Sequence, residues 1–253
     1  MAAESRDDGT TCVVFAAGEY YDAASNPANR VVVPRGAFVV AADGGLDHAR
    51  AAGVTPDVVV GDFDSLRGAR PAPGAGTVAL PPMKDDPDLL SALKIGWAHG
   101  CRTFHVYGAL GGRIDHTLSA IQLTAMLARH GGIGFLHGDG TTVTAVCDGE
   151  LRFAAHDAAP RRMVSVFPHG GPARGVDEPG LRYELMDGTL EADAVQGVSN
   201  EFRPGVPGAV SVREGTLVVT FPAEAPTPEV VRRHAFDGGI GELDTHVSPL
   251  LVR

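Results

Sequence analysis

Short apolar runs alternate with helix-like segments over the first 148 residues of this chain of 253. Almost wholly apolar runs of this length are typical of strands that are buried on both faces of a mainly parallel sheet. The runs are 12–17, 37–42, 57–60, 77–80, 103–107 and 132–136, and the helix-like segments are 45–52, 87–99 and 114–130. This alternation predicts an α/β domain with helices on both faces of the sheet.

The pattern changes after Glu150, where short β-type runs and turn residues replace the helical spacing. Strands are expected at 151–154, 163–167, 181–185, 209–212 and 216–221, with no strong helix among them. We therefore expect an α/β domain over residues 10–148 and a smaller all-β, sandwich-like domain over residues 149–222. Residues 223–253 show no clear period and receive no role from the sequence.

Two of the helix-like segments carry more specific expectations. Segment 114–130 places its apolar residues three or four apart, and a stripe with this spacing faces the core. The stripe is Ile114, Leu118, Ile121, Ala125 and Leu127 or Ala128. In segment 87–99, Asp86 precedes Pro87, which is the favoured order for an N-cap and the first helical residue. We therefore expect Asp86 to cap this helix.

The charge balance and the cysteine content exclude several classes of protein. The 21 Lys and Arg against 31 Asp and Glu give a net charge of −10, with no basic stripe that would bind nucleic acid. No apolar run approaches the ~18 residues that cross a bilayer, and the first residues are polar. The 3 widely spaced cysteines fit a reducing compartment. We expect a cytoplasmic protein without membrane or nucleic-acid partners.

Carboxylates follow the apolar runs at the places where an open α/β sheet binds its ligands. They are Asp43 after the second run, Asp62 and Asp64 after the third, Asp88 after the fourth and Asp115 after the fifth. Taken singly, each also fits a turn or a helix cap. Together, carboxylates ~4–6 Å apart oppose folding unless a cation intervenes, and oxygen ligands of this kind suit Mg²⁺ shared with phosphates.

A glycine-rich turn, GALGGR, precedes Asp115 and ends in Arg113. It lacks the order of a P-loop, and no GxGxxG fingerprint is present. The guanidinium of Arg113 is able to grip a phosphate with two hydrogen bonds beside the proposed metal ligand. Lys84 offers a second positive charge, although a solvated surface lysine is the alternative. These features indicate a site for Mg²⁺ and a polyphosphate.

Four segments, in this order, carry a resemblance. They are ADGGLDHARAAGVTPDVVVGDFDSL (42–66), KDDPDLLSAL (84–93), YGALGGRIDHTLSAIQL (107–123) and GVSNEF (197–202). Together they resemble the ordered motifs of bacterial thiamine pyrophosphokinase, over residues 12–221. The resemblance implies an α/β domain followed by a β-sandwich-like domain, and a homodimer with active sites between the subunits. It also implies the reaction of ATP with thiamine to give thiamine diphosphate and AMP.

The resemblance further implies roles for single residues. The acidic set around Mg²⁺ and the thiamine end would be Asp43, Asp62, Asp64, Asp88 and Asp115, with Asp43, Asp62, Asp64 and Asp88 as the metal ligands. Arg113, with Lys84 nearby, would face the ATP phosphates, and Ser199 and Asn200 would lie by the thiamine pyrimidine. Asp62, Asp64, Asp88, Asp115 and Arg113 form the expected catalytic group, and the carboxylate that accepts the hydroxyl proton is left open.

The chain departs from the family pattern at two places, and two other functions compete with the one implied. Pro87 stands where the family has a threonine, so a hydroxyl contact is lost. The single tryptophan, Trp97, lies on a helix of the first domain rather than beside thiamine. The competing functions are pyrophosphoryl transfer to another alcohol such as a hydroxymethylpterin, and a non-catalytic protein that binds Mg-nucleotide or thiamine diphosphate. The SNEF segment disfavours the first, and the complete acidic set disfavours the second.

Overall fold

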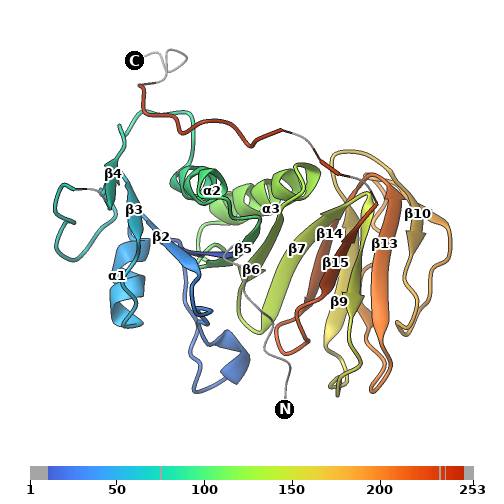
Figure 1. The fold of residues 1–253 in the computed structure, drawn as a ribbon. Coiled ribbons are helices and arrows are strands. Elements are labelled where there is room, and N and C mark those ends of the chain that lie inside the picture. The colour runs from blue at the N-terminus through green and yellow to red at the C-terminus, as the bar shows by residue number, and fades with distance from the viewer. Residues whose placement is uncertain (1–10, 75, 234, 237, 248–253) are drawn as a thin grey trace. The chain divides into compact units, whose positions relative to one another are not determined.

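The computed structural model describes residues 11–247 except residues 75, 234 and 237 (Figure 1). These residues form two compact units. The first contains residues 11–20, 31–120 and 239–247, and the second contains residues 21–30 and 121–238. In this part of the chain no helix is long and apolar enough to cross a membrane. The domain boundaries at residues 148 and 222 were drawn from sequence patterns and stay a prediction.

The first unit contains a parallel sheet. Its strands are β1 (Thr11–Phe15), β2 (Phe38–Ala42), β3 (Val58–Gly61), β4 (Thr77–Ala79) and β5 (Thr103–Tyr107). They lie in the order β5-β1-β2-β3-β4, so that β4, the shortest, is at an edge. Three helices alternate with the strands: α1 (Gly45–Ala51), α2 (Asp88–Ala98) and α3 (Ile114–Arg129). The α/β class expected from the alternating runs is confirmed.

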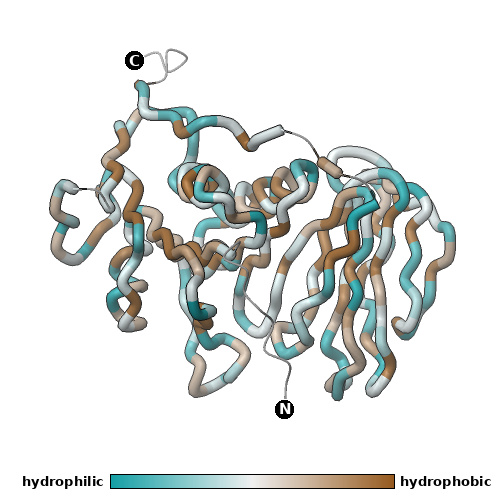
Figure 2. The backbone as a smooth tube through the Cα atoms, viewed as in Figure 1, coloured by the Kyte–Doolittle hydropathy of each residue, from teal (hydrophilic) through white to brown (hydrophobic). Residues whose placement is uncertain are grey.

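Helices α1 and α2 cover opposite faces of this sheet. Val13 of β1 belongs to one buried cluster with Leu46 and Ala49 of α1. Cys12, the preceding residue of β1, points to the other face, where a Cβ on Gly96 of α2 would lie 2.9 Å from its Sγ. The strands are therefore buried on both sides, and their hydrophobic colour in Figure 2 follows from this.

The second unit contains two antiparallel sheets and a single turn of 3-10 helix, η1 (Pro27–Asn29). One sheet has the order β12-β9-β14-β7-β6 and the other β11-β10-β13-β8-β15. The strands of the first are β6 (Ile133–His137), β7 (Thr141–Cys147), β9 (Met163–Pro168), β12 (Asn200–Glu201) and β14 (Thr216–Pro222), and those of the second are β8 (Gly149–Phe153), β10 (Ala173–Asp177), β11 (Gly188–Leu190), β13 (Gly208–Glu214) and β15 (Glu229–Arg232). Both sheets contribute to one buried cluster, which includes Val166, Val219, Leu151 and Val212. This confirms the second, all-β part of the expected fold.

One strand expected in the second unit is absent, and one strand that the sequence did not predict is present. Residues 181–185 form no strand, and only Leu181 makes an isolated bridge, to Phe202. The backbone N–H of Tyr183 donates to the side chain of Asn200 instead of to a neighbouring strand. In the segment 223–253, where the sequence showed no period, β15 adds to the edge of β8 with Val230 opposite Leu151.

Two expectations about helices also need correction. The apolar stripe of α3 is buried at Ala125 and Leu127, but Ile114 and Leu118 are 73% and 55% exposed. The first turns of α3 border a cavity, described below, instead of covering the sheet core. Asp86 does not cap α2, whose N-cap is Pro87 with no side-chain hydrogen bond. The Asp86 carboxylate lies 2.5 Å from Lys94 Nζ, which takes it away from the helix end.

Candidate active site

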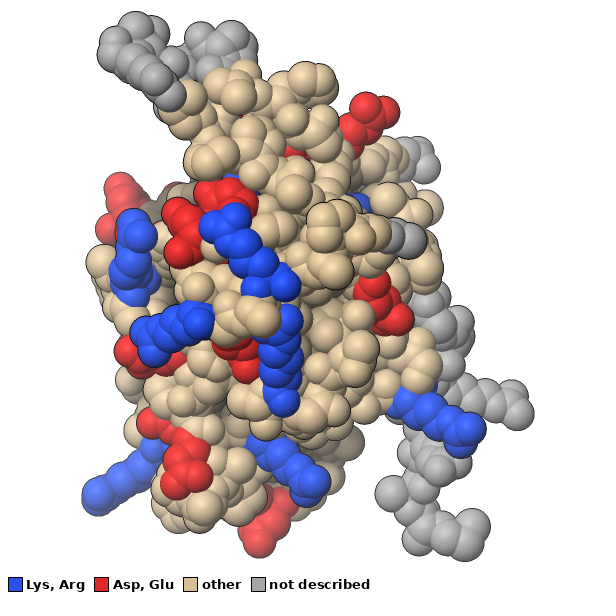
Figure 3. Space-filling view, turned by 90° about the vertical axis from the view of Figure 1, so that its left-hand side faces the viewer, with Lys and Arg blue, Asp and Glu red and all other residues tan. Residues whose placement is uncertain are grey.

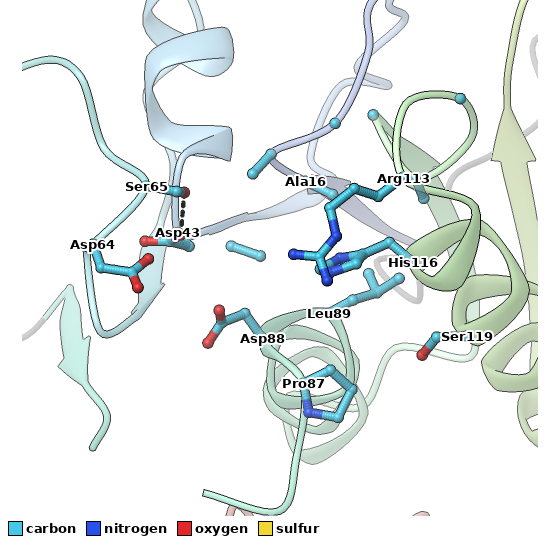
Figure 4. A pocket seen from close by; sticks show the side chains of 16 residues that line it. Ala16, Asp43, Asp64, Ser65, Pro87, Asp88, Leu89, Arg113, His116 and Ser119 are labelled. Carbon is cyan, nitrogen blue, oxygen red and sulfur yellow. Dashed lines mark hydrogen bonds between the residues drawn. The ribbon is translucent and has the colours of Figure 1, made fainter. Parts of the chain in front are cut away.

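A cavity of about 400 Å³ opens at the carboxyl ends of the parallel strands in the first unit (Figure 4). Its walls come from the segments that follow β1, β2, β3 and β5, from the start of α2 and from the first turns of α3. The lining side chains with chemical function are Asp43, Asp64, Ser65, Asp88, Arg113, His116 and Ser119. Ligands of open α/β sheets bind at this edge, so the cavity lies where the strand pattern predicts it.

Asp43 is the most constrained residue of the cavity. It directly follows β2, has a left-handed backbone with φ of 47°, and is only 5% exposed. Its backbone N–H donates to Val60 O at 2.8 Å, and the Ser65 hydroxyl donates to its Oδ2. Its Oδ1 is buried without a hydrogen-bond partner. A buried carboxylate oxygen without a partner costs free energy, which points to a ligand that this structure does not contain.

Asp62 and Asp64 bring further carboxylate oxygens to Asp43. One ligand atom from each of the three residues lies within 4.8 Å of the others. The spacing of Asp62 and Asp64, two residues apart, would place both carboxylates on one side of an extended segment. The structure reaches the same grouping differently, because Phe63 between them is left-handed with φ of 62° and is buried in the core. The backbone N–H of Asp64 donates to Asp62 Oδ1 at 3.2 Å.

Asp88 begins α2 and forms a nearly buried ion pair. Lys84 Nζ lies 2.7 Å from Asp88 Oδ1, and the Lys84 side chain is 6% exposed. Burial raises the pKa of the Asp88 carboxyl, the Lys84 ammonium lowers it, and the charges of Asp43 and Asp62 raise it again. These opposing effects show that Asp88 interacts with the other acids of the cavity, and that Lys84 is held by Asp88.

Arg113 faces the acids from the other side of the cavity, together with His116 (Figure 4). Its guanidinium makes two contacts to Asp115, with Nη2 at 2.6 Å from Oδ2 and Nε at 3.2 Å from Oδ1. The hydrogen bonds from Arg113 lower the pKa of the Asp115 carboxyl. Both side chains are exposed, and Asp115 is bound to Arg113 instead of joining the cluster around Asp43.

Comparison with protein families identifies both parts of the chain. The description "Thiamin pyrophosphokinase, catalytic domain" matches residues 32–133, and "Thiamin pyrophosphokinase, vitamin B1 binding domain" matches residues 153–217. The chain belongs to the thiamine pyrophosphokinase family. Membership assigns it the ATP-dependent transfer of a pyrophosphoryl group to thiamine, and the pterin and non-catalytic alternatives are not favoured.

Solved structures show the same fold. Thiamine pyrophosphokinase from Bacillus subtilis is 22% identical, with a TM-score of 0.70, and the match covers 84% of this chain and 98% of that one. The enzyme from Geobacillus thermodenitrificans is 22% identical, with a TM-score of 0.66 and coverages of 84% and 97%. The enzyme from Candida albicans is 14% identical, with a TM-score of 0.66 and coverages of 84% and 88%. No curated protein sequence matches the chain significantly.

Ser199 and Asn200 lie in the second unit, within the range of the thiamine pyrophosphokinase vitamin B1 binding domain. Ser199 has a left-handed backbone with φ of 64°, and its N–H donates to Ser165 Oγ at 3.1 Å. The Asn200 side-chain amide is buried, and both its nitrogen and its oxygen form hydrogen bonds within the second unit. Its Nδ2 donates to Glu178 Oε2 and to Tyr183 O, both at 2.8 Å, and its Oδ1 accepts from the N–H groups of Tyr183 and Glu201 at 3.0 and 2.9 Å.

Sequence reasoning missed three polar residues of the cavity: Ser65, His116 and Ser119. Ser65 directly follows the Asp62-Phe63-Asp64 segment, and its hydroxyl also accepts from the Gly44 N–H at 3.2 Å. That position beside two acids was the available signal. His116 and Ser119 stand on the first turns of α3, which the apolar stripe assigned to the core.

On the face of the molecule that Figure 3 presents, several Lys and Arg side chains lie next to one another, with Asp and Glu side chains close beside them. A polyanion such as nucleic acid binds to clustered positive charge. The absence of a nucleic-acid partner stays a prediction from the net charge of −10.

Proposed function

We propose that the cavity of the first unit is the active site, in which Mg²⁺ and ATP bind and thiamine is pyrophosphorylated. The observation that carries the proposal is the buried, unpartnered Oδ1 of Asp43 beside the oxygens of Asp62 and Asp64. Three carboxylates so close together suit a hard divalent cation, and the oxygen-only donor set fits Mg²⁺. The residues therefore fit the metal that the family implies.

In this proposal Asp43, Asp62 and Asp64 hold the cation, with Asp88 as a further ligand at the start of α2. When bound, Mg²⁺ neutralises charge on the phosphate oxygens of ATP. The Ser65 hydroxyl, which donates to Asp43 Oδ2, orients that carboxylate so that Oδ1 is presented to the ligand. Lys84 neutralises the charge of Asp88 in their ion pair. In this proposal Lys84 acts on ATP indirectly, through Asp88, and does not contact the phosphates.

Arg113 is proposed to bind the ATP phosphates. Its guanidinium points into the cavity opposite the acids, and the two contacts that it makes to Asp115 use the geometry that also suits a phosphate. Asp115 holds the Arg113 guanidinium in a fixed orientation through these two contacts. The thiamine oxygen attacks the β-phosphorus of ATP, the bond from that phosphorus to the α-phosphate oxygen breaks, and AMP leaves while a carboxylate accepts the hydroxyl proton.

Thiamine is proposed to bind through the second unit. Ser199 contacts the pyrimidine, and Asn200, whose amide is engaged with Glu178 and Tyr183, holds the neighbouring backbone in place. We further propose a cytoplasmic homodimer in which the vitamin-binding residues of one subunit complete the cavity of the other. Ile114 and Leu118, exposed apolar side chains one turn apart on α3 and beside the cavity, support this proposal, because exposed apolar side chains that lie together are typical of an interface.

The test measures AMP formation by the full chain with and without thiamine, at several Mg²⁺ concentrations. We expect AMP only when thiamine and a divalent cation are both present. Mg²⁺ alone should stabilise the protein against heat, by about 2.7 kcal/mol at a hundred times the dissociation constant. Asp43→Asn should lose this stabilisation and the activity, whereas Asp193→Asn, which removes the same charge from an exposed turn, should keep both. No thiamine-dependent AMP, or equal stabilisation of Asp43→Asn by Mg²⁺, would refute the proposal.

A further inference from the structure

A long loop follows β3 and carries two residues of the cavity. Residues 62–74, between β3 and β4, form neither helix nor strand. The first part of this loop brings Asp64 and Ser65 to the cavity, and Figure 4 shows both beside Asp43. An irregular segment of this length has many backbone conformations of similar energy, so contacts from outside the loop must select one of them. The positions of Asp64 and Ser65 therefore depend on what holds the loop.

The side chain of Asp47, on α1, binds the backbone of this loop. Its Oδ2 accepts hydrogen bonds from the N–H of Arg67 at 2.8 Å and from the N–H of Gly68 at 3.0 Å. Hydrogen bonds to a carboxylate are about twice as strong as those between neutral groups. The same two bonds lower the pKa of the Asp47 carboxyl. One side chain thus fixes two successive peptide groups, two and three residues after Ser65.

Arg50, one turn further along α1, extends this contact. Its Nη1 donates to Ala69 O at 2.8 Å and lies 3.4 Å from Asp47 Oδ1. The helix therefore binds the N–H groups of residues 67 and 68 and the carbonyl of residue 69 in succession. The side chain of Asp47 is 26% exposed and that of Arg50 is 41% exposed, so water competes less with the bonds to Asp47.

The close approach of the loop to Asp47 leaves no room for a side chain at position 68. A Cβ on Gly68 would lie 2.5 Å from Asp47 Oδ1 and 3.1 Å from Arg50 Nη1. The first distance is shorter than any normal contact between non-bonded atoms, so a side chain there would push the loop and the carboxylate apart. Glycine is required at position 68 because the backbone comes this near to the carboxylate.

The loop contacts the start of α1 at a second place, next to the cavity. The Ser65 hydroxyl donates to Asp43 Oδ2 and accepts from the Gly44 N–H at 3.2 Å. Residues 65 to 68 are thus bound to the segment 43–47 at both ends, by Ser65 and through Asp47. A shift of the loop away from Asp47 would carry Ser65 with it and release the carboxylate of Asp43, whose Oδ1 has no partner.

We propose that Asp47 is a positioning residue of the active site, which holds the loop in the conformation that places Asp64 and Ser65 beside Asp43. The inference rests on the proposed function, because it requires these residues to hold the cation. Asp47 is not among the residues that line the cavity, so it acts through the loop. Loss of its two hydrogen bonds should loosen the loop and weaken cation binding while the fold remains.

The first test measures hydrogen–deuterium exchange in peptides that cover residues 64–70, without Mg²⁺ or substrates. In Asp47→Ala the amides of Arg67 and Gly68 should exchange at least about tenfold faster, because each loses a charged acceptor. Asp47→Asn keeps an acceptor oxygen and should retain most of the protection. Asp193→Ala, which removes the same charge from an exposed turn, is the control and should match the wild type. Equal protection in the wild type and in Asp47→Ala would overturn the proposal.

The second test measures the Mg²⁺ concentration that gives half of the thermal stabilisation by Mg²⁺ alone. Asp47→Ala should raise this concentration by about tenfold, as is typical for loss of a group that orients a metal ligand. Asp47→Asn should leave it close to that of the wild type. A merely structural role of Asp47 would lower the melting temperature without moving this concentration, and that result would overturn the positioning role. An equal rise in Asp47→Asn and Asp47→Ala would assign the effect to the lost charge and would also overturn it.

Gly68→Ala disturbs the same contact and keeps the charge of Asp47. In the wild-type background it should speed exchange at Arg67 and raise the Mg²⁺ concentration, because the new Cβ meets the Asp47 carboxylate. In the Asp47→Ala background it should add little, because that substitution removes the atom that the Cβ meets. Fully additive effects of the two substitutions would overturn the proposal. If Mg²⁺ does not stabilise the wild type, the proposed function fails, and the exchange test still decides whether Asp47 holds the loop.

Discussion

Replacing Asn200 with alanine should destabilise the second unit chiefly through Glu178. The Glu178 carboxylate is 2% exposed, and Asn200 Nδ2 donates to its Oε2 at 2.8 Å. Leaving a buried charge without its partner costs about 3–5 kcal/mol, whereas a neutral buried group costs about 1–3 kcal/mol. The backbone N–H and C=O of Tyr183 also lose their hydrogen bonds to Asn200. Tyr183 is exposed, so water replaces these bonds and their loss adds little to the cost. The loss in unfolding free energy should therefore be about 3–5 kcal/mol where Glu178 is charged.

The loss should depend on pH in a defined direction. Burial raises the pKa of Glu178 above its ordinary 4.5, and the hydrogen bond from Asn200 lowers it. The folded protein therefore binds this proton more tightly than the unfolded chain does. Stability consequently falls as the pH rises from about 4.5 through the raised folded pKa, and is constant above it. Asn200→Ala removes the hydrogen bond that lowers the pKa of Glu178, so the folded pKa rises further. The variant should therefore lose more unfolding free energy at pH 8 than at pH 5.

Urea unfolding followed by circular dichroism at pH 5 and pH 8 measures both effects. Glu178→Gln keeps the shape but removes the charge, so Asn200→Ala in that background should cost about 1–3 kcal/mol at either pH. The difference between the two backgrounds is the coupling between the residues. An equal loss at both pH values, or an equal loss in both backgrounds, would refute the assignment of the cost to a buried charge.

Three further predictions concern the cavity. Asp62→Asn and Asp64→Asn should each lower AMP formation by at least about 10²-fold with an unchanged circular dichroism spectrum, and near-normal turnover of both would contradict the metal assignment. Arg113→Lys should lower kcat by up to about 10²-fold with little change in the KM for thiamine, because the two-point grip is lost, and a change in that KM alone would place Arg113 elsewhere. Mixed heterodimers of an Asp62→Asn chain and a Ser199→Ala chain should recover activity, and heterodimers seen by native mass spectrometry without such recovery would mean that each site lies within one chain.

The strands of the first unit were predictable because they are buried on both faces. The buried residues 12–15 of β1 and 39–42 of β2 are all apolar, so the composition of each run alone reveals the strand. The second unit is harder, since β11 is only 3 residues long and the pairing of β10 shifts register between Arg174 and Val176. Residues 181–185 resemble a strand in sequence, but the backbone N–H and C=O of Tyr183 bond to the side chain of Asn200 instead of to a neighbouring strand.

The sequence predicted where the candidate site lies better than it predicted which side chains interact within it. Because ligands of open α/β sheets bind at the carboxyl ends of the strands, the sequence alone predicts that Asp43, Asp62 and Asp64 lie at one site. The partners of the charged groups depend on tertiary geometry that no local pattern contains. Asp86 faces Lys94 two turns along α2, and Asp115 faces Arg113, although both have the sequence context of a helix cap.

The edge strand β4 limits how copies of this chain can associate. Its 3 residues sit at the open side of the parallel sheet, where unpaired backbone groups would otherwise template a further strand. Leu80 is followed at once by Pro81 and Pro82, which have no N–H to donate. Sheet extension from this edge is therefore blocked within a few residues, which protects the chain from edge-to-edge aggregation at high concentration. An assembly that buries this edge must then be held by side-chain packing instead of by a continuous sheet.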